Sequence, residues 1–162
     1  MSNVVEREQQ ERFMREAIAL AEASVRDGGG PFGAVVVRDG VIVGRGHNRV
    51  TLDCDPTAHA EVVAIRDAAG RLGDFRLDGC ELYVNCEPCP MCLAAAYWAR
   101  LSRVYFAGSM VDAVRGGFDD ALIQQEVCLP TGQRQMPMQQ LLQEEAQAVF
   151  AAWMAKDDRT DY

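Results

Sequence analysis

The feature that most constrains this chain is a set of metal-binding side chains split between two short segments. One segment is His59-Ala60-Glu61 and the other is Pro88-Cys89-Pro90-Met91-Cys92. A Cys-x-x-Cys pair and a distant imidazole make a nitrogen and sulfur set suited to tetrahedral zinc. We therefore predict that the fold brings His59, Cys89 and Cys92 together around one Zn²⁺ ion per chain.

The predicted site has an open coordination position, which a catalytic zinc requires. A structural zinc normally takes a fourth Cys or His, but the other histidine, His47, falls in a predicted strand. Glu61 lies too close to His59 for both to bind the ion comfortably from one helical face. Its carboxylate can instead reach water on the metal and pass a proton to a leaving amine. We predict Glu61 as the general acid/base.

Each of these residues also has a simpler interpretation. A lone Cys-x-x-Cys is found in thioredoxin-like redox proteins, although such a pair normally lacks a partnered His-x-Glu. A glutamate in the first turn of a helix is commonly a surface charge, and a single histidine is usually structural. Taken together, however, the segments give the pattern His-x-Glu…Pro-Cys-x-x-Cys, which is the signature of zinc deaminases.

The six cysteines and the amino-terminal segment bear on the compartment. In a small secreted chain, an even number of cysteines suggests a set of disulfides. In a reducing cytosol, closely spaced cysteines more often bind metal or do redox chemistry, and composition alone does not decide between these two uses. The segment MSNVVEREQQER lacks the apolar run of a secretory signal, and no stretch is long enough to span a membrane. We expect a cytoplasmic protein, in which the cysteines outside the metal motif are buried apolar groups: Cys54, Cys80, Cys86 and Cys128.

The charge balance favours a small-molecule substrate over a nucleic acid. The chain has 24 acidic and 16 basic residues and a formal net charge of −8. A protein that grips nucleic acid needs a basic surface to displace counterions from phosphates. A local basic patch is still open, because five arginines could gather on one face: Arg66, Arg71, Arg76, Arg100 and Arg103.

Hydrophobic periodicity divides the 162 residues, the size of one domain, into alternating helices and strands. An Asp39-Gly40 pair between two β-branched runs indicates a hairpin. Gly28-Gly29-Gly30-Pro31 is expected to end the first helix, and Gly70 the second. A mixed sheet covered by helices follows, with strands at 33–38, 41–46, 81–86 and 104–107, and helices at 6–27, 57–69, 91–100, 121–127 and 139–155.

The zinc segments Thr57-Ala58-His59-Ala60-Glu61 and Cys86-Glu87-Pro88-Cys89-Pro90-Met91-Cys92 resemble those of the cytidine/deoxycytidylate deaminase-like zinc hydrolases. The resemblance implies an α/β fold of three layers, α/β/α, with a five-stranded mixed sheet between helices. Within that family the chain is most similar to the bacterial guanine deaminases. The similarity runs nearly end to end, through Gly30 to Val35, Asp55 to Glu61, Met91 to Arg100, Gly117 to Asp120 and Tyr162. It implies one zinc-dependent deaminase domain over 1–162 that converts guanine to xanthine and ammonia.

The same resemblance implies the residues that hold the purine base. Asn48 corresponds to a substrate-binding amide, which can both donate and accept, although an asparagine here could equally close a turn. Phe32, Trp98 and Phe118 correspond to walls around a planar base, although core packing is the commoner fate of aromatic side chains.

Two further residues come from the resemblance to guanine deaminases. Asp120 corresponds to a second acidic residue that accepts from guanine N–H groups or relays a proton; helix capping by Asp119-Asp120 is the alternative. Tyr162 corresponds to a terminal tyrosine that enters the partner's pocket in a homodimer that exchanges segment 135–162, although a terminal residue is ordinarily frayed.

Three rival functions are open. A tRNA adenosine deaminase shares the zinc motifs, but it is expected to carry a basic surface and carboxyl terminus. Cytosine or another aminated azine, such as an aminotriazine or pterin, is a further possible substrate. A non-enzymatic zinc-binding protein is the alternative of a different class, and Glu61 beside an open metal position argues against it.

Overall fold

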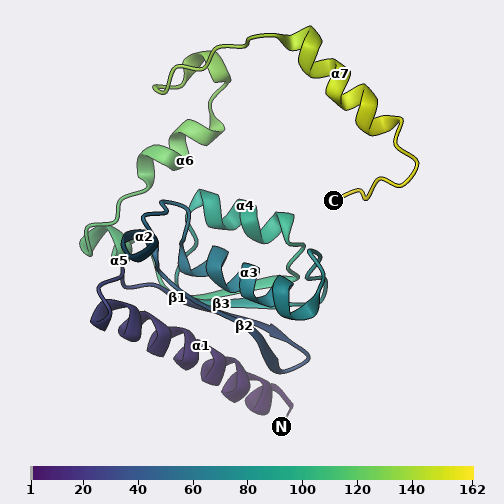
Figure 1. The fold of residues 1–162 in the computed structure, drawn as a ribbon. Helices are drawn as coiled ribbons and strands as arrows, with labels where there is room; N and C mark the ends of the chain where they lie inside the picture. Colours follow the sequence, from purple (N-terminus) through teal and green to yellow (C-terminus); the bar gives the residue numbers. More distant parts are fainter. Residues whose placement is uncertain (1) are drawn as a thin grey trace. The chain divides into compact units, whose positions relative to one another are not determined.

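The computed structural model describes residues 2–162, which divide into a unit that ends at Ala121 and a second unit, Leu122–Tyr162. In these residues four strands form one mixed sheet in the spatial order β2-β1-β3-β4 (Figure 1). The whole sheet belongs to the first unit, where the predicted metal ligands also lie.

The first two strands form the predicted hairpin. β1 (Gly33–Arg38) pairs antiparallel with β2 (Val41–His47), and the last pair of the ladder is Arg38 with Val41. The connecting residues Asp39 and Gly40 have φ angles of 51° and 75°. Two residues in the left-handed region make the tight turn whose twist matches that of the strands, which is why an Asp-Gly pair predicts it.

The other two strands are parallel and are joined by a helix. β3 (Glu81–Cys86) pairs antiparallel with β1, and β4 (Arg103–Gly108) pairs parallel with β3. A parallel pair needs a crossover connection, which here contains α4 (Pro90–Trp98). All four strands lie within one or two residues of their predicted bounds.

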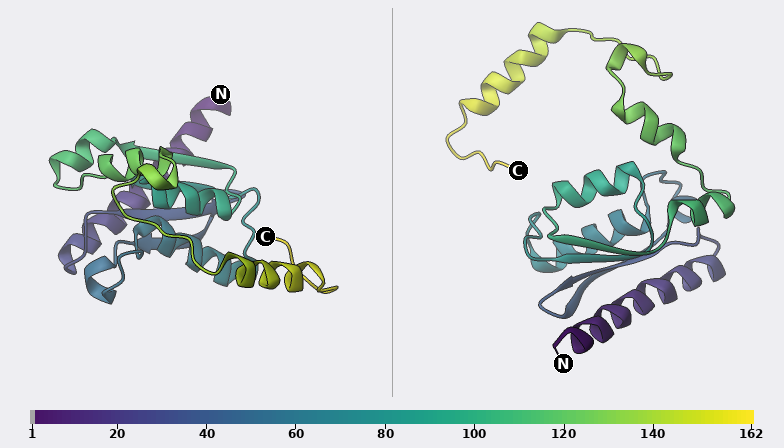
Figure 2. Two further views of the ribbon diagram at one scale, coloured as in Figure 1. Left: turned by 90° about the horizontal axis from the view of Figure 1, so that it is seen from above. Right: turned by 180° about the vertical axis from the view of Figure 1, so that it is seen from behind.

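Helices cover both faces of the sheet, and the predicted three layers are confirmed (Figures 1 and 2). α1 (Ser2–Arg26) covers one face, while α3 (Ala60–Leu72) and α4 form the layer over the other. Alternate residues of β1 point to opposite faces, so this strand is buried on both sides. One core forms against α1 from Phe13, Val35, Val37 and Tyr83; the other forms against α3 from residues that include Ala34, Val36, Ala60, Ala64, Leu82 and Val84.

The prediction of a five-stranded sheet was wrong, since residues 2–162 contain four strands. Beyond β4 the chain forms only helices: α5 (Met110–Arg115), α6 (Ala121–Cys128), the 3-10 helix η1 (Thr131–Gln133) and α7 (Gln143–Met154). The fifth strand rested on family likeness alone. Residues 109–142 lack an alternating apolar run, and Pro130 and Pro137 cannot donate to a ladder.

The end of the second predicted helix also differs from the expectation. Gly70 lies inside α3, and the helix ends at Leu72, followed by Gly73 in the left-handed conformation with φ 66°. The short helix α2 (Val50–Asp53) was not predicted, because four residues are too few to show a helical repeat of apolar side chains. Within residues 2–162, no helix has both the length and the apolar character needed to cross a membrane.

The second unit, considered by itself, buries none of its side chains. It is held by local bonds, such as those from the Arg134 guanidinium to the carbonyls of Glu126 and Leu129, both 3.1 Å long. The large apolar side chains of α7 are exposed, including Val149, Phe150 and Met154. Burial of apolar area is the main favourable term in folding, and this unit gains little of it within its own residues.

Candidate metal centre and substrate site

Strand directions bring the predicted site residues to one edge of the sheet, which we call the site edge. β2 and β3 both run antiparallel to β1 and therefore run the same way, and β4 is parallel to β3. Their carboxyl-terminal ends and the beginning of β1 therefore share an edge. Ligands of α/β proteins commonly bind outside the carboxyl ends of strands. The segments that meet the site edge carry Phe32 before β1, Asn48 after β2, Cys89 and Cys92 after β3, and Phe118 after β4.

The three predicted metal ligands lie together. Nδ1 of His59 is 3.4 Å from Sγ of Cys92 and 3.6 Å from Sγ of Cys89. One ligand atom from each residue lies within 4.8 Å of the others, and no fourth Cys, His or carboxylate in residues 2–162 joins the group. Three nitrogen and sulfur donors with no fourth protein ligand are the arrangement of a catalytic zinc site.

Two helix starts hold these side chains in place. His59 directly precedes α3 and Cys89 directly precedes α4; neither side chain caps its helix, so both are available to a ligand. Cys92 is in the first turn of α4 and is fully buried. α3 packs very closely against the sheet at Gly46, which has no side chain to keep the two apart. A β-carbon at this position would collide with the carbonyl of Ala60 and lie 2.5 Å from the nitrogen of Ala64.

The protonation of the two sulfurs fits a cation between them. Hydrogen bonds with Cys92 and then His59 lower the pKa of Cys89 to about 4, so this sulfur is a thiolate at neutral pH. The same contact with Cys89, together with burial and nearby Glu61, raises the pKa of Cys92. A second thiolate can form beside the first only if a positive ion offsets both charges. The donor set therefore fits Zn²⁺, which binds imidazole and thiolate readily.

Glu61 lies in the first turn of α3 and is only 6% exposed. Burial raises the pKa of its carboxyl group, so the charged form is less favoured here than in water. A buried carboxyl that can hold or release a proton beside a metal group has the properties of a general acid/base.

Asn48 is buried and nearly all of its polar groups are engaged. Its side-chain oxygen accepts from the backbone N–H groups of Gly30 and Val50, at 3.3 and 3.2 Å. Its own N–H donates to the carbonyl of Phe32, and its carbonyl accepts from the Ser24 hydroxyl. Within residues 2–162 its side-chain nitrogen has no hydrogen-bond partner. Asn48 thus closes a turn, as one interpretation predicted, and keeps an amide donor for a ligand.

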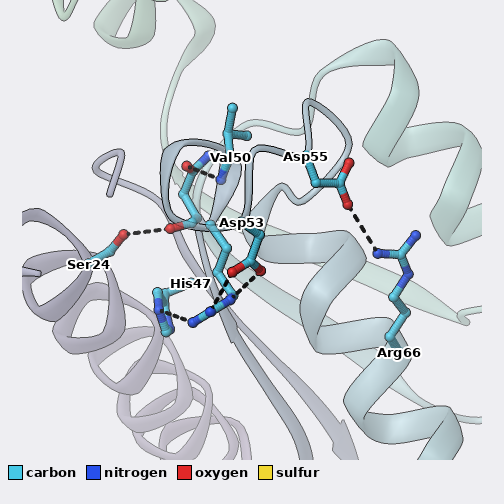
Figure 3. A network of polar contacts seen from close by, with 8 residues as sticks. Ser24, His47, Val50, Asp53, Asp55 and Arg66 are labelled. Atoms are coloured by element: carbon cyan, nitrogen blue, oxygen red, sulfur yellow. Dashed lines mark hydrogen bonds and ion pairs between the residues drawn. The ribbon is translucent and has the colours of Figure 1, made fainter. Parts of the chain in front are cut away.

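The segment after Asn48, which includes Val50 and Asp53 (Figure 3), is bonded to the residue that precedes His59. The N–H of Arg49 donates to the carbonyl of Ala58, at 2.9 Å, one residue before His59. The Arg49 guanidinium makes two bonds of 2.6 Å to the carboxylate of Asp53, one turn further along the chain. These bonds set the position of Asn48 beside the start of α3.

Two of the predicted aromatic walls meet. The rings of Phe32 and Phe118 are in an edge-to-face contact with centroids 4.8 Å apart. Asn85 fixes the loop that carries Phe32, because its side chain accepts from the N–H of Gly33 at 2.8 Å and donates to the carbonyl of Pro31 at 2.9 Å. Phe32 also packs against the core on the α3 side.

The other predicted site residues are Trp98, Asp120 and Tyr162. Trp98 ends α4, about 12 Å along the axis from Pro90 at the usual helical rise, and it is 67% exposed. Asp120 is half-buried, and the neighbouring Asp119 accepts from the N–H of Ala121 at 2.9 Å. Tyr162 belongs to the second unit. Substrate contact by these residues remains a prediction.

Sequence reasoning missed two polar side chains that support the site, Ser24 and Asn85. A signal for the first existed, since Ser24 continues the buried stripe of Ala17 and Ala21 on α1. A polar residue on such a stripe needs a buried partner. Nothing in the sequence identified Asn85, whose bonds depend on the pairing of β1 with β3.

Comparisons with known proteins agree with this geometry. A family model described as the cytidine and deoxycytidylate deaminase zinc-binding region matches residues 7–108. Guanine deaminase of Bacillus subtilis is 48% identical over 94% of this chain and 98% of its own length, and its X-ray structure superposes with a TM-score of 0.90. A guanine deaminase structure from Nitrosomonas europaea is 32% identical over 67% of this chain and 63% of its own, with a TM-score of 0.64. A tRNA-specific adenosine deaminase of Aquifex aeolicus is 43% identical over 66% of this chain and 70% of its own.

Proposed function

The chain belongs to the cytidine and deoxycytidylate deaminase zinc-binding family, and from this premise we propose that it hydrolyses guanine to xanthine and ammonia. The observation that carries this proposal is the likeness to a guanine deaminase over 98% of that enzyme's length, with a TM-score of 0.90. The His59, Cys89 and Cys92 group at the site edge supplies the chemistry that such an activity needs.

We assign the metal and proton roles within that group. His59, Cys89 and Cys92 hold one zinc ion, which when bound supplies a Lewis acid that makes water nucleophilic at neutral pH. Glu61 accepts the proton that the attacking water loses and delivers it to the exocyclic amine. A C–O bond forms at the ring carbon, the C–N bond breaks, and ammonia leaves.

The base is held by groups around this centre. The side-chain nitrogen of Asn48 donates to an acceptor on the purine, because its oxygen is already engaged by Gly30 and Val50. Phe32 and Phe118 contact the purine ring. Asp120 accepts from guanine N–H groups, which adenine and cytosine lack at the corresponding ring position.

Two observations favour a free base over tRNA. The similarity to the Aquifex tRNA-specific adenosine deaminase covers 66% of this chain, whereas that to guanine deaminase covers 94%. Three of the arginines considered for a basic patch are paired with aspartates instead: Arg66 with Asp55, Arg71 with Asp67 and Arg76 with Asp78. Paired guanidinium groups displace fewer phosphate counterions.

We further propose that two chains form a homodimer by exchanging the carboxyl-terminal segment 135–162, so that Tyr162 completes the partner's site. The apolar side chains of α7 have no burial within their own unit, including Val149 at 68% and Phe150 at 67% exposed. A second copy that offers the same surface buries them at low cost, since each subunit receives the contacts that it gives.

A reducing, cytoplasmic compartment suits this site. None of the six cysteines is in a disulfide, although the prediction that Cys54 and Cys128 are buried was wrong, because both are exposed. Disulfides form and persist in oxidising compartments, where Cys89 and Cys92 would be at risk of oxidation.

Ammonia release from a panel of compounds tests the substrate assignment. The panel contains guanine, adenine, cytosine, an aminotriazine, a pterin and tRNA, and each is assayed with the zinc-loaded protein. We expect release from guanine alone. Turnover of adenosine in tRNA would support the rival deaminase, and zinc binding without any turnover would support a non-enzymatic protein.

A further inference from the structure

Ser24 is the buried side chain whose partner matters most for the site. It is fully buried on α1, and its hydroxyl donates to the backbone carbonyl of Asn48 at 3.0 Å. Figure 3 shows this bond between the helix and the segment that follows β2. Because Ser24 and Asn48 are 24 positions apart, the bond joins two elements that local structure does not hold together.

Among the residues that the structure describes, Ser24 is the one whose side chain hydrogen-bonds Asn48. The side-chain oxygen of Asn48 accepts from Gly30 and Val50, and its N–H donates to Phe32. All three partners are backbone groups. Within residues 2–162, the Ser24 hydroxyl is the one group of α1 that hydrogen-bonds Asn48.

The packing around this bond is tight. A β-carbon at Gly29 would lie 2.5 Å from both the Asn48 carbonyl oxygen and the Ser24 hydroxyl oxygen. The N–H of Gly29 also donates to the carbonyl of Ser24 at 2.8 Å. The Ser24 hydroxyl satisfies the Asn48 carbonyl directly, without a bridging water. Loss of the hydroxyl therefore leaves that buried acceptor without its partner.

We infer that Ser24 is a positioning residue for substrate binding, which fixes the Asn48 backbone so that the side-chain amide points in one direction as a donor to the purine. This inference rests on the proposed function, in which Asn48 contacts the base. A donor held in one direction loses less conformational freedom on binding than a mobile one.

The positioning role predicts a specific kinetic change in Ser24→Ala. Asn48 binds the base in both the ground state and the transition state, so its misplacement raises KM more than it lowers kcat. We expect KM for guanine to rise about threefold or more, the scale on which neighbouring residues couple. A purely structural role would lower the active fraction, and therefore the apparent kcat, at unchanged KM.

Ser102→Ala is the matched control. Its hydroxyl also donates to a backbone carbonyl, that of Cys80, at 2.7 Å. Ser102 and Cys80 precede β4 and β3, so this bond lies at the sheet edge opposite the site edge. We expect Ser102→Ala to keep the wild-type KM and zinc content.

A double-mutant cycle with Asn48→Ala decides the question. If Ser24 acts through Asn48, Ser24→Ala has no further effect on KM in the Asn48→Ala background, while zinc content is unchanged throughout. Ser24→Cys, close in size with a weaker donor, enters the same cycle if Ser24→Ala does not fold.

The outcomes separate this inference from the function on which it rests. If wild-type protein releases no ammonia from guanine, the proposed function fails and this inference fails with it. If the wild type is active and Asn48→Ala raises KM, but Ser24→Ala behaves like Ser102→Ala or adds its full effect to Asn48→Ala, the positioning role alone is overturned.

Discussion

His59 and Cys92 are 33 positions apart in the chain, yet Nδ1 of one lies 3.4 Å from Sγ of the other. The contact forms because α3 and α4 begin at the same edge of the sheet, and Cys89 completes the group. Glu61 lies in the same first turn of α3 but outside the group of three donors. The metal ligands and the proton carrier are therefore separate residues.

Cys92→Ala is expected to lose both zinc and activity, whereas Glu61→Gln keeps about one zinc per chain and loses turnover by about 10²- to 10⁴-fold. Metal analysis of the purified variants measures the first effect and ammonia release the second. Chelation of the wild type should also lower its thermal midpoint, because the ion binds the folded state. A metal-free Glu61→Gln protein would make Glu61 a ligand and contradict its assigned role.

Asn48→Asp separates the two functions of Asn48. Aspartate keeps an oxygen for the N–H groups of Gly30 and Val50 but has no amide to donate. We expect a folded protein with normal zinc content, and a KM for guanine raised about tenfold or more, as for a lost hydrogen bond in a buried site. An unchanged KM would reduce Asn48 to a turn residue.

Asp120→Asn removes a negative acceptor without changing size, so guanine turnover should fall sharply while zinc content stays the same. The control is Asp119→Ala, which removes the bond to the N–H of Ala121. That control should cost about 0.5–1.5 kcal/mol of stability, as for one hydrogen bond, with little change in activity. Steady-state kinetics and denaturant unfolding measure the two effects. Full activity in Asp120→Asn would remove Asp120 from the site.

Gly46→Ala should destabilise the fold by about 1–3 kcal/mol, because the added methyl group would collide with the backbone of α3 near Ala60 and Ala64. Zinc affinity should fall as well, since the start of α3 carries His59. The matched control is Gly70→Ala inside α3, where a β-carbon meets nothing within 4 Å. There the gain in helix propensity is about 1 kcal/mol. Similar unfolding curves for the two variants would contradict the close packing of α3.

Deletion of Tyr162 should leave fold, dimer and zinc intact and still reduce activity, if the carboxyl-terminal segments are exchanged. Co-expression of this deletion with Glu61→Gln gives the sharper test. Each mixed dimer then has one site with both defects and one with neither, so activity should return from two impaired parents. Verified mixed dimers that stay inactive would place Tyr162 in its own subunit's site and exclude the exchange.

The sequence by itself determined the chemistry and most of the local structure. Imidazole, thiolates and carboxylate at the spacing of His59, Glu61, Cys89 and Cys92 indicate a catalytic zinc, whatever the surrounding fold. The Asp39-Gly40 turn and the four apolar runs placed the strands within one or two residues, because turn chemistry and apolar patterning are local properties of the sequence.

Only the tertiary structure decided how these parts meet. Strand direction set which loops share the site edge, and it depends on long-range pairing of β1 with both β2 and β3. The number of strands, expected as five, was likewise fixed by which segments find a partner. The bonds of Asn85 to distant backbone groups had no local signature, and the buried stripe that includes Ser24 did not identify its partner, because a hydrogen bond between elements exists only after the sheet has assembled.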